Sequence, residues 1–437
     1  MFLYKLSSQP DLLALHRVNP ERYPFLLERS SFAETSRYSL LFAFPEESLR
    51  VEYDAKTPFT QHFDALFDAH KVTHTVDTDL PFTGGWFVYL GYELAGQVEP
   101  VLELKPDVFK LPLAIATRVK TAIIIDHLKA ESWFVSERED ADEFQHVKAD
   151  LDNALPVVAD TLAIELTEDD PQQYLEGVAK ISEYIKSGDV FQVNLSRAWN
   201  GAFSHEVDAA QIYSGLREAN PAPFSALVKY ADFSIISSSP ERLVRVTDRL
   251  IETRPIAGTR PRSDDAQKDE RLLQELISHP KERAEHIMLI DLERNDMGRI
   301  CQPGTVDVNE LMMVETYEHV HHIVSNIRGR LQQEVTPGDV INAVFPGGTI
   351  TGCPKVRCME IIAELEGIGR GPYTGSVGYI NHSGDMDLNI LIRTMVMKGK
   401  QLNFRTGAGI VYDSIPQNEV EETRHKAKGV LRTFFSD

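Results

Sequence analysis

The segment DPQQYLEGVAKISEYIKSGDVFQVNLS, residues 170–196, predicts a helix that is followed, after a short turn, by a strand. Asp170 can cap the helix, Pro171 can open it and Gly188 can end it, with apolar residues at helical spacing in between. From Phe191 onward apolar and polar residues alternate, as they do in a strand with one buried face. The close succession of these two elements indicates a fold that mixes helices and strands.

Similar signals continue on both sides of this segment. Helices are predicted from about residue 265 to residue 293 and at the C-terminus. Strands are predicted at residues 37–45, 84–93, 121–127, 225–239, 242–255 and 401–406. Strands and helices mixed in this way, with hairpins, predict an α+β (mixed α/β) fold with antiparallel sheets. Charged residues near 140–172 mark a candidate boundary, which gives an N-terminal region 1–150 and a second region 165–437.

The charge balance limits the partners of the chain. Its 437 residues carry 45 Lys and Arg against 66 Asp and Glu, a net charge of −21, which argues against nucleic-acid binding and against binding to an anionic membrane. An anionic substrate would then need a local cationic site. The sequence has no apolar run of roughly 20 residues and no N-terminal run long enough for a signal peptide, so a cytoplasmic protein is expected. Cys301, Cys353 and Cys358 lack CxxC spacing and are expected to be reduced thiols.

Two candidate helices carry glutamates three residues apart, which places each pair on one helix face. The pairs are Glu282 with Glu285, after Pro280, and Glu419 with Glu422, followed by Lys426. Four carboxylates on two helices could converge on a hard cation such as Mg²⁺, which prefers oxygen ligands. The alternative is a pair of solvated acidic faces, and the pattern alone leaves both open.

Two glycine-rich stretches fail the known nucleotide-binding patterns. TGAGIVYD, residues 406–413, has Tyr412 in place of the third glycine of a dinucleotide motif, and FPGGTITGCPK, residues 345–355, lacks the Gly-Lys pair of a P-loop. Both are expected to be turns, either ordinary ones or turns whose backbone N–H groups approach an anion.

Two further side chains have open roles at this level. His322 lies in a strand-like run, where a histidine is more often a core or surface residue than a catalyst. Arg393 interrupts the apolar run LNILIRTMVM, so it forms either a structural ion pair or a clamp for an anionic substrate.

Nine blocks of the sequence closely resemble motifs of the chorismate-utilising enzymes, in the order and spacing of that family. They are SSSPERL, ETRPIAGTRPR, KERAEHIMLIDLERNDMGR, VHHIVS, FPGGTITGCPKVRCMEII, YTGSVGY, LNILIRT, GAGIV and EVEETRHKAKG, which span about residues 172–435. The family includes anthranilate synthase component I, aminodeoxychorismate synthase component I, and the isochorismate and salicylate synthases. The resemblance implies two packed, antiparallel-rich sheets flanked by helices, with 165–437 as the chorismate-binding catalytic region.

Region 1–150 resembles the N-terminal region of anthranilate synthases. Its stretch LLERSSFAETSRYS, which begins at Leu26, is similar to the segment that binds feedback tryptophan in those enzymes.

The resemblance also implies roles for matching residues. Glu285 and Glu422 would bind Mg²⁺, with Glu282 and Glu419 holding water ligands of the metal, and the metal would hold the ring carboxylate of chorismate. The enolpyruvyl carboxylate would be bound by Tyr373, Arg393 and the backbone N–H groups of Gly407 and Gly409, while Lys426 would add positive charge near the ring carboxylate. Glu241 would protonate the departing 4-hydroxyl. The remaining residues implied at the substrate are Gly258, Thr259, His322 and Thr349.

Gln192 and Ala257 occupy the positions that decide the reaction. Family members that add water carry a lysine base at the position of Gln192, and an amide cannot take a proton, so amination is expected. The chain has no glutaminase cysteine motif, so ammonia is expected from a separate glutamine amidotransferase subunit or from solution.

The resemblance leaves two possible products, aminodeoxychorismate and anthranilate. Aminodeoxychorismate synthases commonly carry a lysine nucleophile in PIKGT, whereas PIAGT, with Ala257, is typical of anthranilate synthases. FPGGTITG, LLERS and the short N-terminal region instead resemble the para-aminobenzoate branch, which is the branch expected here, with anthranilate synthesis as the alternative. A non-catalytic sensor would be expected to lose Glu241 or a metal-binding glutamate, and all are present.

Overall fold

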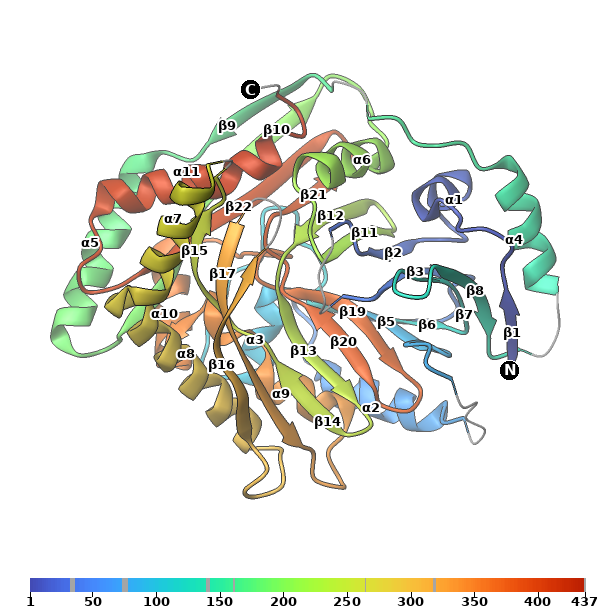
Figure 1. Ribbon diagram of the computed structural model, residues 1–437, viewed down its shortest axis with the longest axis horizontal. Coiled ribbons are helices and arrows are strands. Elements are labelled where there is room, and N and C mark those ends of the chain that lie inside the picture. The colour runs from blue at the N-terminus through green and yellow to red at the C-terminus, as the bar shows by residue number, and fades with distance from the viewer. Residues whose placement is uncertain are drawn as a thin grey trace.

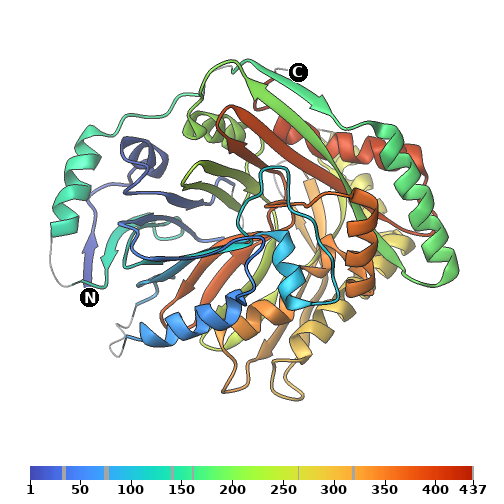
Figure 2. The same cartoon turned by 180° about the vertical axis from the view of Figure 1, so that it is seen from behind.

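Two antiparallel sheets pack face to face, and helices cover their outer faces (Figures 1 and 2). This computed structural model describes residues 1–31, 36–72, 78–138, 142–159, 162–263, 265–316 and 320–435, with only the backbone described for Thr259, Lys281 and Val320. The α+β fold expected from the sequence, with two antiparallel-rich sheets flanked by helices, is confirmed.

The first sheet has twelve strands in the order β1-β8-β7-β3-β2-β11-β12-β21-β22-β10-β18, with β9 beside β10. The bounds are β1 Phe2–Lys5, β2 Phe25–Glu28, β3 Tyr38–Ala43, β7 Thr121–Asp126, β8 Glu131–Ser136, β9 Ile164–Glu168, β10 Gln192–Phe203, β11 Phe224–Tyr230, β12 Phe233–Ser239, β18 Gly352–Cys353, β21 Thr394–Lys398 and β22 Gln401–Ile410. Because β2 pairs with β11, the regions 1–150 and 165–437 contribute to one sheet. The division into these two regions stays a prediction.

The second sheet has ten strands in the order β15-β17-β14-β13-β20-β19-β5-β6-β4, with β16 beside β17. The bounds are β4 Ser48–Val51, β5 Gly85–Leu90, β6 Ala114–Val119, β13 Arg242–Thr247, β14 Leu250–Thr253, β15 Ile256–Pro261, β16 Asp307–Thr316, β17 Val320–Arg330, β19 Ser376–Asn381 and β20 Met386–Asn389. Here too the two regions meet, since β5 pairs with β19.

The helices form the outer layers. They are α1 Leu12–Val18, α2 Phe59–Ala69, α3 Ala95–Val98, α4 Asp142–Asn153, α5 Pro171–Ser187, α6 Ala209–Ala219, α7 Ala266–Ser278, α8 Pro280–Gly298, α9 Pro337–Val344, α10 Lys355–Glu366 and α11 Pro416–Leu431, with short 3₁₀ turns η1 Tyr92–Leu94 and η2 Gly348–Ile350. Apolar residues of α1, α6 and α11 pack on the first sheet, and those of α2, α8 and α9 pack on the second. None of the helices described is both long and apolar enough to cross a membrane.

The core between the two sheets is rich in aromatic side chains. Phe25 of β2 stacks on Phe87 of β5, with ring centroids 3.9 Å apart, and both side chains are buried. Burial of one such side chain contributes about 1.5–3 kcal/mol to folding. This layer joins the N-terminal strands to the strands that carry the site described below.

The helix and the strand predicted from residues 170–196 are confirmed, although both faces of the strand are buried in its first eight residues and not one face alone. The Asp170 carboxylate accepts a hydrogen bond from the Gln172 N–H at 3.0 Å, and Gly188 ends α5 in the left-handed region with φ of 83°. One part of the prediction is wrong: Phe191 does not share the buried face of the strand but is 66% exposed, because β10 begins at Gln192.

The turn expected at 406–413 is also wrong for its first half. Residues 406–410 continue β22, with Gly407 opposite Ser196 and Gly409 opposite Asn194 on β10. The glycines serve close approach within a sheet rather than a turn. The stretch 345–355 does form an irregular turn, which contains η2 and the two-residue strand β18.

Candidate active site

Glu241 lies between the two sheets, directly after β12 and before β13. Its side chain is 7% exposed, and Thr349 of η2 donates a hydrogen bond from Oγ1 to Glu241 Oε1 at 2.9 Å. Burial raises the pKa of Glu241 to about 7, and the neighbouring Glu293 raises it further, while the hydrogen bond from Thr349 and the charge of Lys426 oppose the rise. A carboxyl group in this state can hold a proton near neutral pH and release it to a nearby oxygen.

Arg393 faces the same region from the turn between β20 and β21. Its guanidinium donates to Asn220 Oδ1 at 3.4 Å, and it forms no ion pair with any residue that the structure describes. Burial lowers the pKa of Arg393, and the charge of Glu241 raises it. Of the two roles that the sequence left open, a structural ion pair is therefore not observed. A partly buried cation without an ion-pair partner favours an anionic ligand.

The side chains of Tyr373 and Asn194 both lie against Gly407 of β22. A Cβ atom on Gly407 would lie 2.8 Å from Tyr373 Oη and 2.8 Å from Asn194 Oδ1, so only glycine fits between them. Burial raises the pKa of Tyr373 to about 12, which keeps its hydroxyl protonated and able to donate a hydrogen bond.

Gln192 lies against Gly409 as Asn194 lies against Gly407: a Cβ atom on Gly409 would be 2.6 Å from Gln192 Nε2. Gln192 Oε1 and Asn194 Oδ1 are both buried and make no hydrogen bond within the described part of the chain. Buried amide oxygens without partners are costly, so a bound ligand or water is expected to satisfy them. Asn194 is a residue that the sequence analysis missed, although it follows Gln192 on the same strand face.

The backbone N–H groups of Gly407 and Gly409 point away from β10. Lys426 of α11 donates from Nζ to the Gly407 carbonyl at 3.0 Å, so this carbonyl lies outside the β10–β22 ladder. In an antiparallel ladder alternate residues turn both backbone groups outward, which places the N–H groups of both glycines on the same open edge. β22 pairs with β21 only as far as Phe404, so the described strands leave this edge uncovered.

Ala257 and its neighbours lie on β15 along β17. Ala257 is opposite Ile323, and a bulge separates it from Thr259, whose backbone is opposite His322; the side chain of Thr259 lies outside the described residues. Burial lowers the pKa of His322 to about 4, the charge of Arg393 lowers it too, and a hydrogen bond to the Gly258 backbone opposes them. The imidazole is therefore neutral at neutral pH.

The glutamate pairs lie on α8 and α11, and each is held by a cation. Glu282 Oε1 is 2.7 Å from Arg260 Nη2, and Glu422 is 2.8 Å from Lys426 Nζ. Glu282 Oε2 is buried without a hydrogen bond, and a Cβ atom on Gly258 would lie 2.0 Å from it. α8 therefore packs directly against the β15 bulge.

Glu285 and Glu419 are partly exposed. Among the described residues, no three His, Cys, Asp or Glu side chains converge closely enough to hold a metal ion by themselves.

Glu293 is a second carboxyl group that the sequence analysis missed. It is 3% exposed on α8 and accepts a hydrogen bond from the Gly348 N–H at 3.1 Å. Burial raises the pKa of Glu293 to about 7, with Lys355 opposing and Asp296 adding to the rise. Gly348 and Thr349 are consecutive, so η2 touches Glu293 with one residue and Glu241 with the next.

Comparison of the sequence with known protein families shows which family this chain belongs to. The profile of the family described as "chorismate binding enzyme" matches residues 23–432. The chain belongs to the chorismate-binding enzymes. The sequence-based resemblance to that family is confirmed.

Relatives within this family carry different names. "Aminodeoxychorismate synthase component 1" of Bacillus subtilis is 43% identical over 391 residues, which cover 85% of this chain and 82% of the relative. "Anthranilate synthase component I-like protein" of Synechocystis sp. is 43% identical over 364 residues, 83% of this chain and 75% of the relative. The crystal structure of anthranilate synthase component I from Streptococcus pneumoniae superposes with a TM-score of 0.81 at 32% identity, covering 91% of this chain and 93% of that one.

The segment that resembles a tryptophan-binding region begins in β2. Glu28 accepts a hydrogen bond from Tyr213 Oη at 2.8 Å, and Ser30 Oγ lies 2.8 Å from Ser225 Oγ. Residues 32–35 of this segment lie outside the described residues. Tryptophan binding stays a prediction.

Proposed function

We propose that this chain aminates chorismate to 4-amino-4-deoxychorismate, the precursor of para-aminobenzoate, with ammonia from a glutamine amidotransferase subunit. The observation that carries amination is the neutral amide of Gln192, which lies beside Gly409 at the position where water-adding family members carry a lysine base. Glu241 supplies the protonatable carboxyl group that the reaction also needs. The para-aminobenzoate branch is supported by the FPGGTITG block and by 43% identity to the Bacillus subtilis relative of that name.

Two groups of donors suit the two carboxylates of chorismate. Arg393, the Tyr373 hydroxyl and the outward N–H groups of Gly407 and Gly409 would bind the enolpyruvyl carboxylate. Hydrogen bonds between a charged donor and a carboxylate are stronger than those between neutral groups. Arg393 has no competing carboxylate partner in the described residues. Lys426 would add positive charge on the side of the ring carboxylate. These cations explain how a chain of net charge −21 could take a dianion.

The four glutamates proposed to lie near the ring carboxylate are suitable ligands for Mg²⁺. Carboxylates are its preferred protein ligands, and it commonly keeps several waters and bridges to the substrate, so a site does not need three converging side chains. Glu285 and Glu422 would hold the ion, with Glu282 and Glu419 binding its waters, and the unpartnered Glu282 Oε2 is available for that purpose. When bound, the ion would neutralise and orient the ring carboxylate.

The chemical step is a substitution at C4 of the ring. Ammonia forms the new C–N bond as the C4–O bond breaks, the proton of Glu241 passes to the departing hydroxyl to form water, and the new ammonium group then loses one proton. Neutral ammonia needs no base to become a nucleophile, which agrees with the amide at Gln192. Ala257 has no nucleophile to offer, so the proposal requires direct attack by ammonia.

Anthranilate synthesis is the second candidate, and Ala257 is the observation that favours it. A methyl group beside the bulge at Gly258 leaves room for ammonia to attack C2 instead of C4.

Product identity separates the two candidates. The purified chain is incubated with chorismate, Mg²⁺ and ammonium, with and without added aminodeoxychorismate lyase, and the products are analysed by chromatography and mass spectrometry. We expect 4-aminobenzoate only when lyase is present. Anthranilate formed without lyase would establish the second candidate instead.

Glu285→Gln and Glu422→Gln are each expected to abolish Mg²⁺-dependent turnover while the chain still folds, because an amide is a much poorer ligand for a hard cation than a carboxylate. The measurement is the initial rate against Mg²⁺ concentration, with circular dichroism to check folding. Glu421→Gln is the matched control, since Glu421 is on the same helix but exposed and paired with Arg424. Wild-type Mg²⁺ dependence in Glu285→Gln would remove the metal assignment.

Glu293→Gln is expected to move the alkaline limb of the pH–rate profile about one unit lower, because the amide cannot supply the negative charge that raises the pKa of Glu241. Activity requires protonated Glu241, so it falls as pH rises through this pKa, and a lower pKa brings the fall to lower pH. The profile of kcat is measured from acid to alkaline pH. Asp291→Asn, an exposed position on the same helix, should leave the profile unchanged. An unshifted limb in Glu293→Gln would show that the two carboxyl groups act independently.

A further inference from the structure

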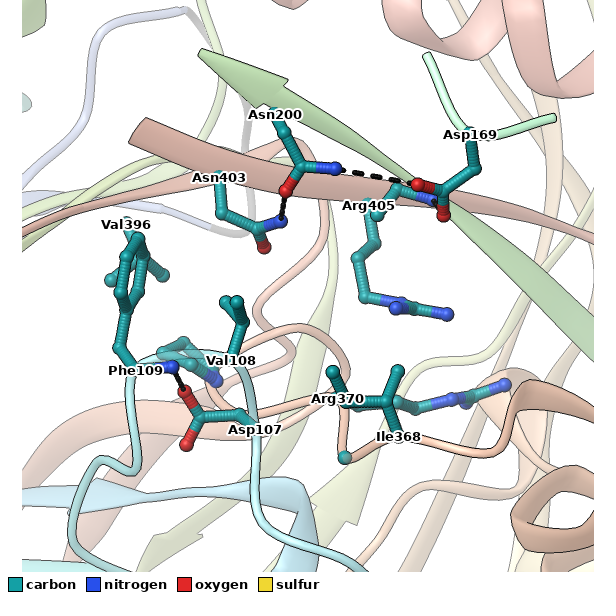
Figure 3. Close-up of a pocket in the computed structure, with 13 residues that line it drawn as sticks. Asp107, Val108, Phe109, Asp169, Asn200, Ile368, Arg370, Val396, Asn403 and Arg405 are labelled. Carbon is teal, nitrogen blue, oxygen red and sulfur yellow. Dashed lines mark hydrogen bonds between the residues drawn. The ribbon is translucent and has the colours of Figure 1, made fainter. Parts of the chain in front are cut away.

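A separate cavity of about 150 Å³ lies beside the first sheet (Figure 3). Its walls come from β10, β21 and β22, from two loops at residues 107–109 and 368–372, and from Asp169 between β9 and α5. None of the residues assigned above to chorismate or to Mg²⁺ lines it. An apolar cavity of about 150 Å³ in another protein is large enough for benzene, so this cavity has room for one six-membered ring.

The cationic wall of the cavity is Arg405, which is 5% exposed. Its Nε donates to Ser196 Oγ at 3.0 Å and its Nη2 to Glu366 Oε2 at 3.0 Å, but its Nη1 makes no hydrogen bond to any described residue. Arg370 pairs with the same carboxylate at 2.6 Å, so two guanidinium groups share the single charge of Glu366. Figure 3 shows the Arg405 guanidinium directed into the cavity above Arg370. This wall can therefore accept one further carboxylate.

The acidic side chains at the cavity are already engaged. Asp107 accepts hydrogen bonds from the N–H groups of Phe109 and Leu111, both at 2.8 Å. Asp169 accepts from the Ala198 N–H at 2.8 Å and from Asn200 Nδ2 at 3.3 Å. Both carboxylates are held by internal donors, and the ion pair of Arg405 in the described residues is with Glu366 and not with either of them.

The opposite polar wall offers an acceptor. Asn403 donates from Nδ2 to Asn200 Oδ1 at 2.8 Å, which fixes the orientation of its amide. The Asn403 amide oxygen is then directed toward the cavity, as Figure 3 shows, and it makes no hydrogen bond with described residues. A ligand N–H group would satisfy it.

The mouth of the cavity is apolar and exposed. Val108 and Ile368 are 50% and 41% exposed, and both line the cavity. Phe109 and Val396 continue this apolar wall inward. A ring placed in the mouth would cover both exposed side chains, at a gain of about 25 cal/mol for each Å² of apolar surface removed from water.

We propose that this cavity binds a one-ring aromatic amino carboxylate, with the carboxylate on Arg405 Nη1, the amino group on the Asn403 amide oxygen and the ring against Val108 and Ile368. The proposal concerns a second site and does not depend on which product the active site forms.

The cavity is also connected to the active site. Arg370 donates to the Asn194 carbonyl at 2.6 Å and to the Ile350 carbonyl at 3.1 Å, and its guanidinium lies 5.6 Å from the centre of the Tyr373 ring. A ligand that moves Arg370 would therefore act on the strand and the turn that position Gln192 and Thr349.

The test measures binding directly, without turnover. The full chain is titrated with 4-aminobenzoate by isothermal titration calorimetry, alone and with saturating chorismate, and the titration is repeated with benzoate and with aniline. We expect one site per chain that chorismate does not compete for, with benzoate at least threefold weaker and aniline at least tenfold weaker. Binding that chorismate displaces, or aniline binding as tight as that of 4-aminobenzoate, would overturn the proposal.

Two variants locate the ligand. Ile368→Trp fills the mouth and should weaken 4-aminobenzoate at least tenfold, whereas Val158→Trp, at a position that is 66% exposed and outside the cavity, should not. Asn403→Leu should remove the preference for 4-aminobenzoate over benzoate. Both substitutions are at partly exposed positions, and thermal unfolding confirms that the variants fold. Unchanged affinity in folded Ile368→Trp would show that the ligand binds elsewhere.

Discussion

Glu241→Gln is expected to lower kcat for chorismate amination by about 100- to 10,000-fold, the range that general acid catalysis contributes, and to leave KM for chorismate nearly unchanged. The amide is similar in size to the carboxyl group and can still accept the hydrogen bond from Thr349 at Oε1. It cannot supply a proton to the departing 4-hydroxyl, which would have to leave as hydroxide. The loss should therefore fall on the chemical step and not on binding.

The measurements are kcat and KM from initial rates, together with chorismate affinity in the absence of ammonia. Glu364→Gln is a matched control, since Glu364 is exposed on α10 and bonds only to the Tyr184 hydroxyl among described residues. The wild type should lose activity as pH rises through about 7, because burial raises the pKa of Glu241 to about 7 and only the protonated form is an acid. If the variant kept more than a tenth of wild-type kcat, another group would have to be the acid.

The elements of this fold were largely predictable, because local signals determine them. Asp170, Pro171 and Gly188 bound α5 as their chemistry predicts, and the alternation after Phe191 produces β10. Sheet order was not available from such signals. β2 pairs with β11 and β5 with β19 across long separations in sequence, and only packing of the whole chain decides those partners.

The candidate site was predictable in its residue types and less so in its electrostatics. The resemblance to a family indicated Glu241, Arg393 and Tyr373, whose roles stay predictions. Glu293 was missed because its burial beneath Gly348 is a tertiary contact with no sequence pattern of its own. The turn expected near Gly407 was wrong because glycines are also required where a sheet passes close to side chains, as at Tyr373.

Arg393→Met is expected to raise the Kd for chorismate at least about 100-fold, because the enolpyruvyl carboxylate would lose its cationic partner. The same change should leave the melting temperature of the ligand-free chain unchanged or raise it. Arg393 has no ion pair in the described residues and burial lowers its pKa, so in the folded chain the cost of desolvating this charge is offset only by the hydrogen bond to Asn220 and by the charge of Glu241. Removing it relieves that cost.

Arg242 provides the contrast that makes this test decisive. Its side chain is 9% exposed and is paired with that of Asp387, which is 23% exposed, with Nε 2.8 Å from Oδ1, so Arg242→Met would leave a mostly buried carboxylate without its partner and should destabilise the fold by about 2–4 kcal/mol. The two arginine variants are compared by thermal unfolding without ligand and by chorismate titration. A structural role for Arg393 predicts that both variants lose stability together, whereas a role as substrate clamp predicts opposite effects: lost affinity with retained stability for Arg393→Met, and lost stability for Arg242→Met.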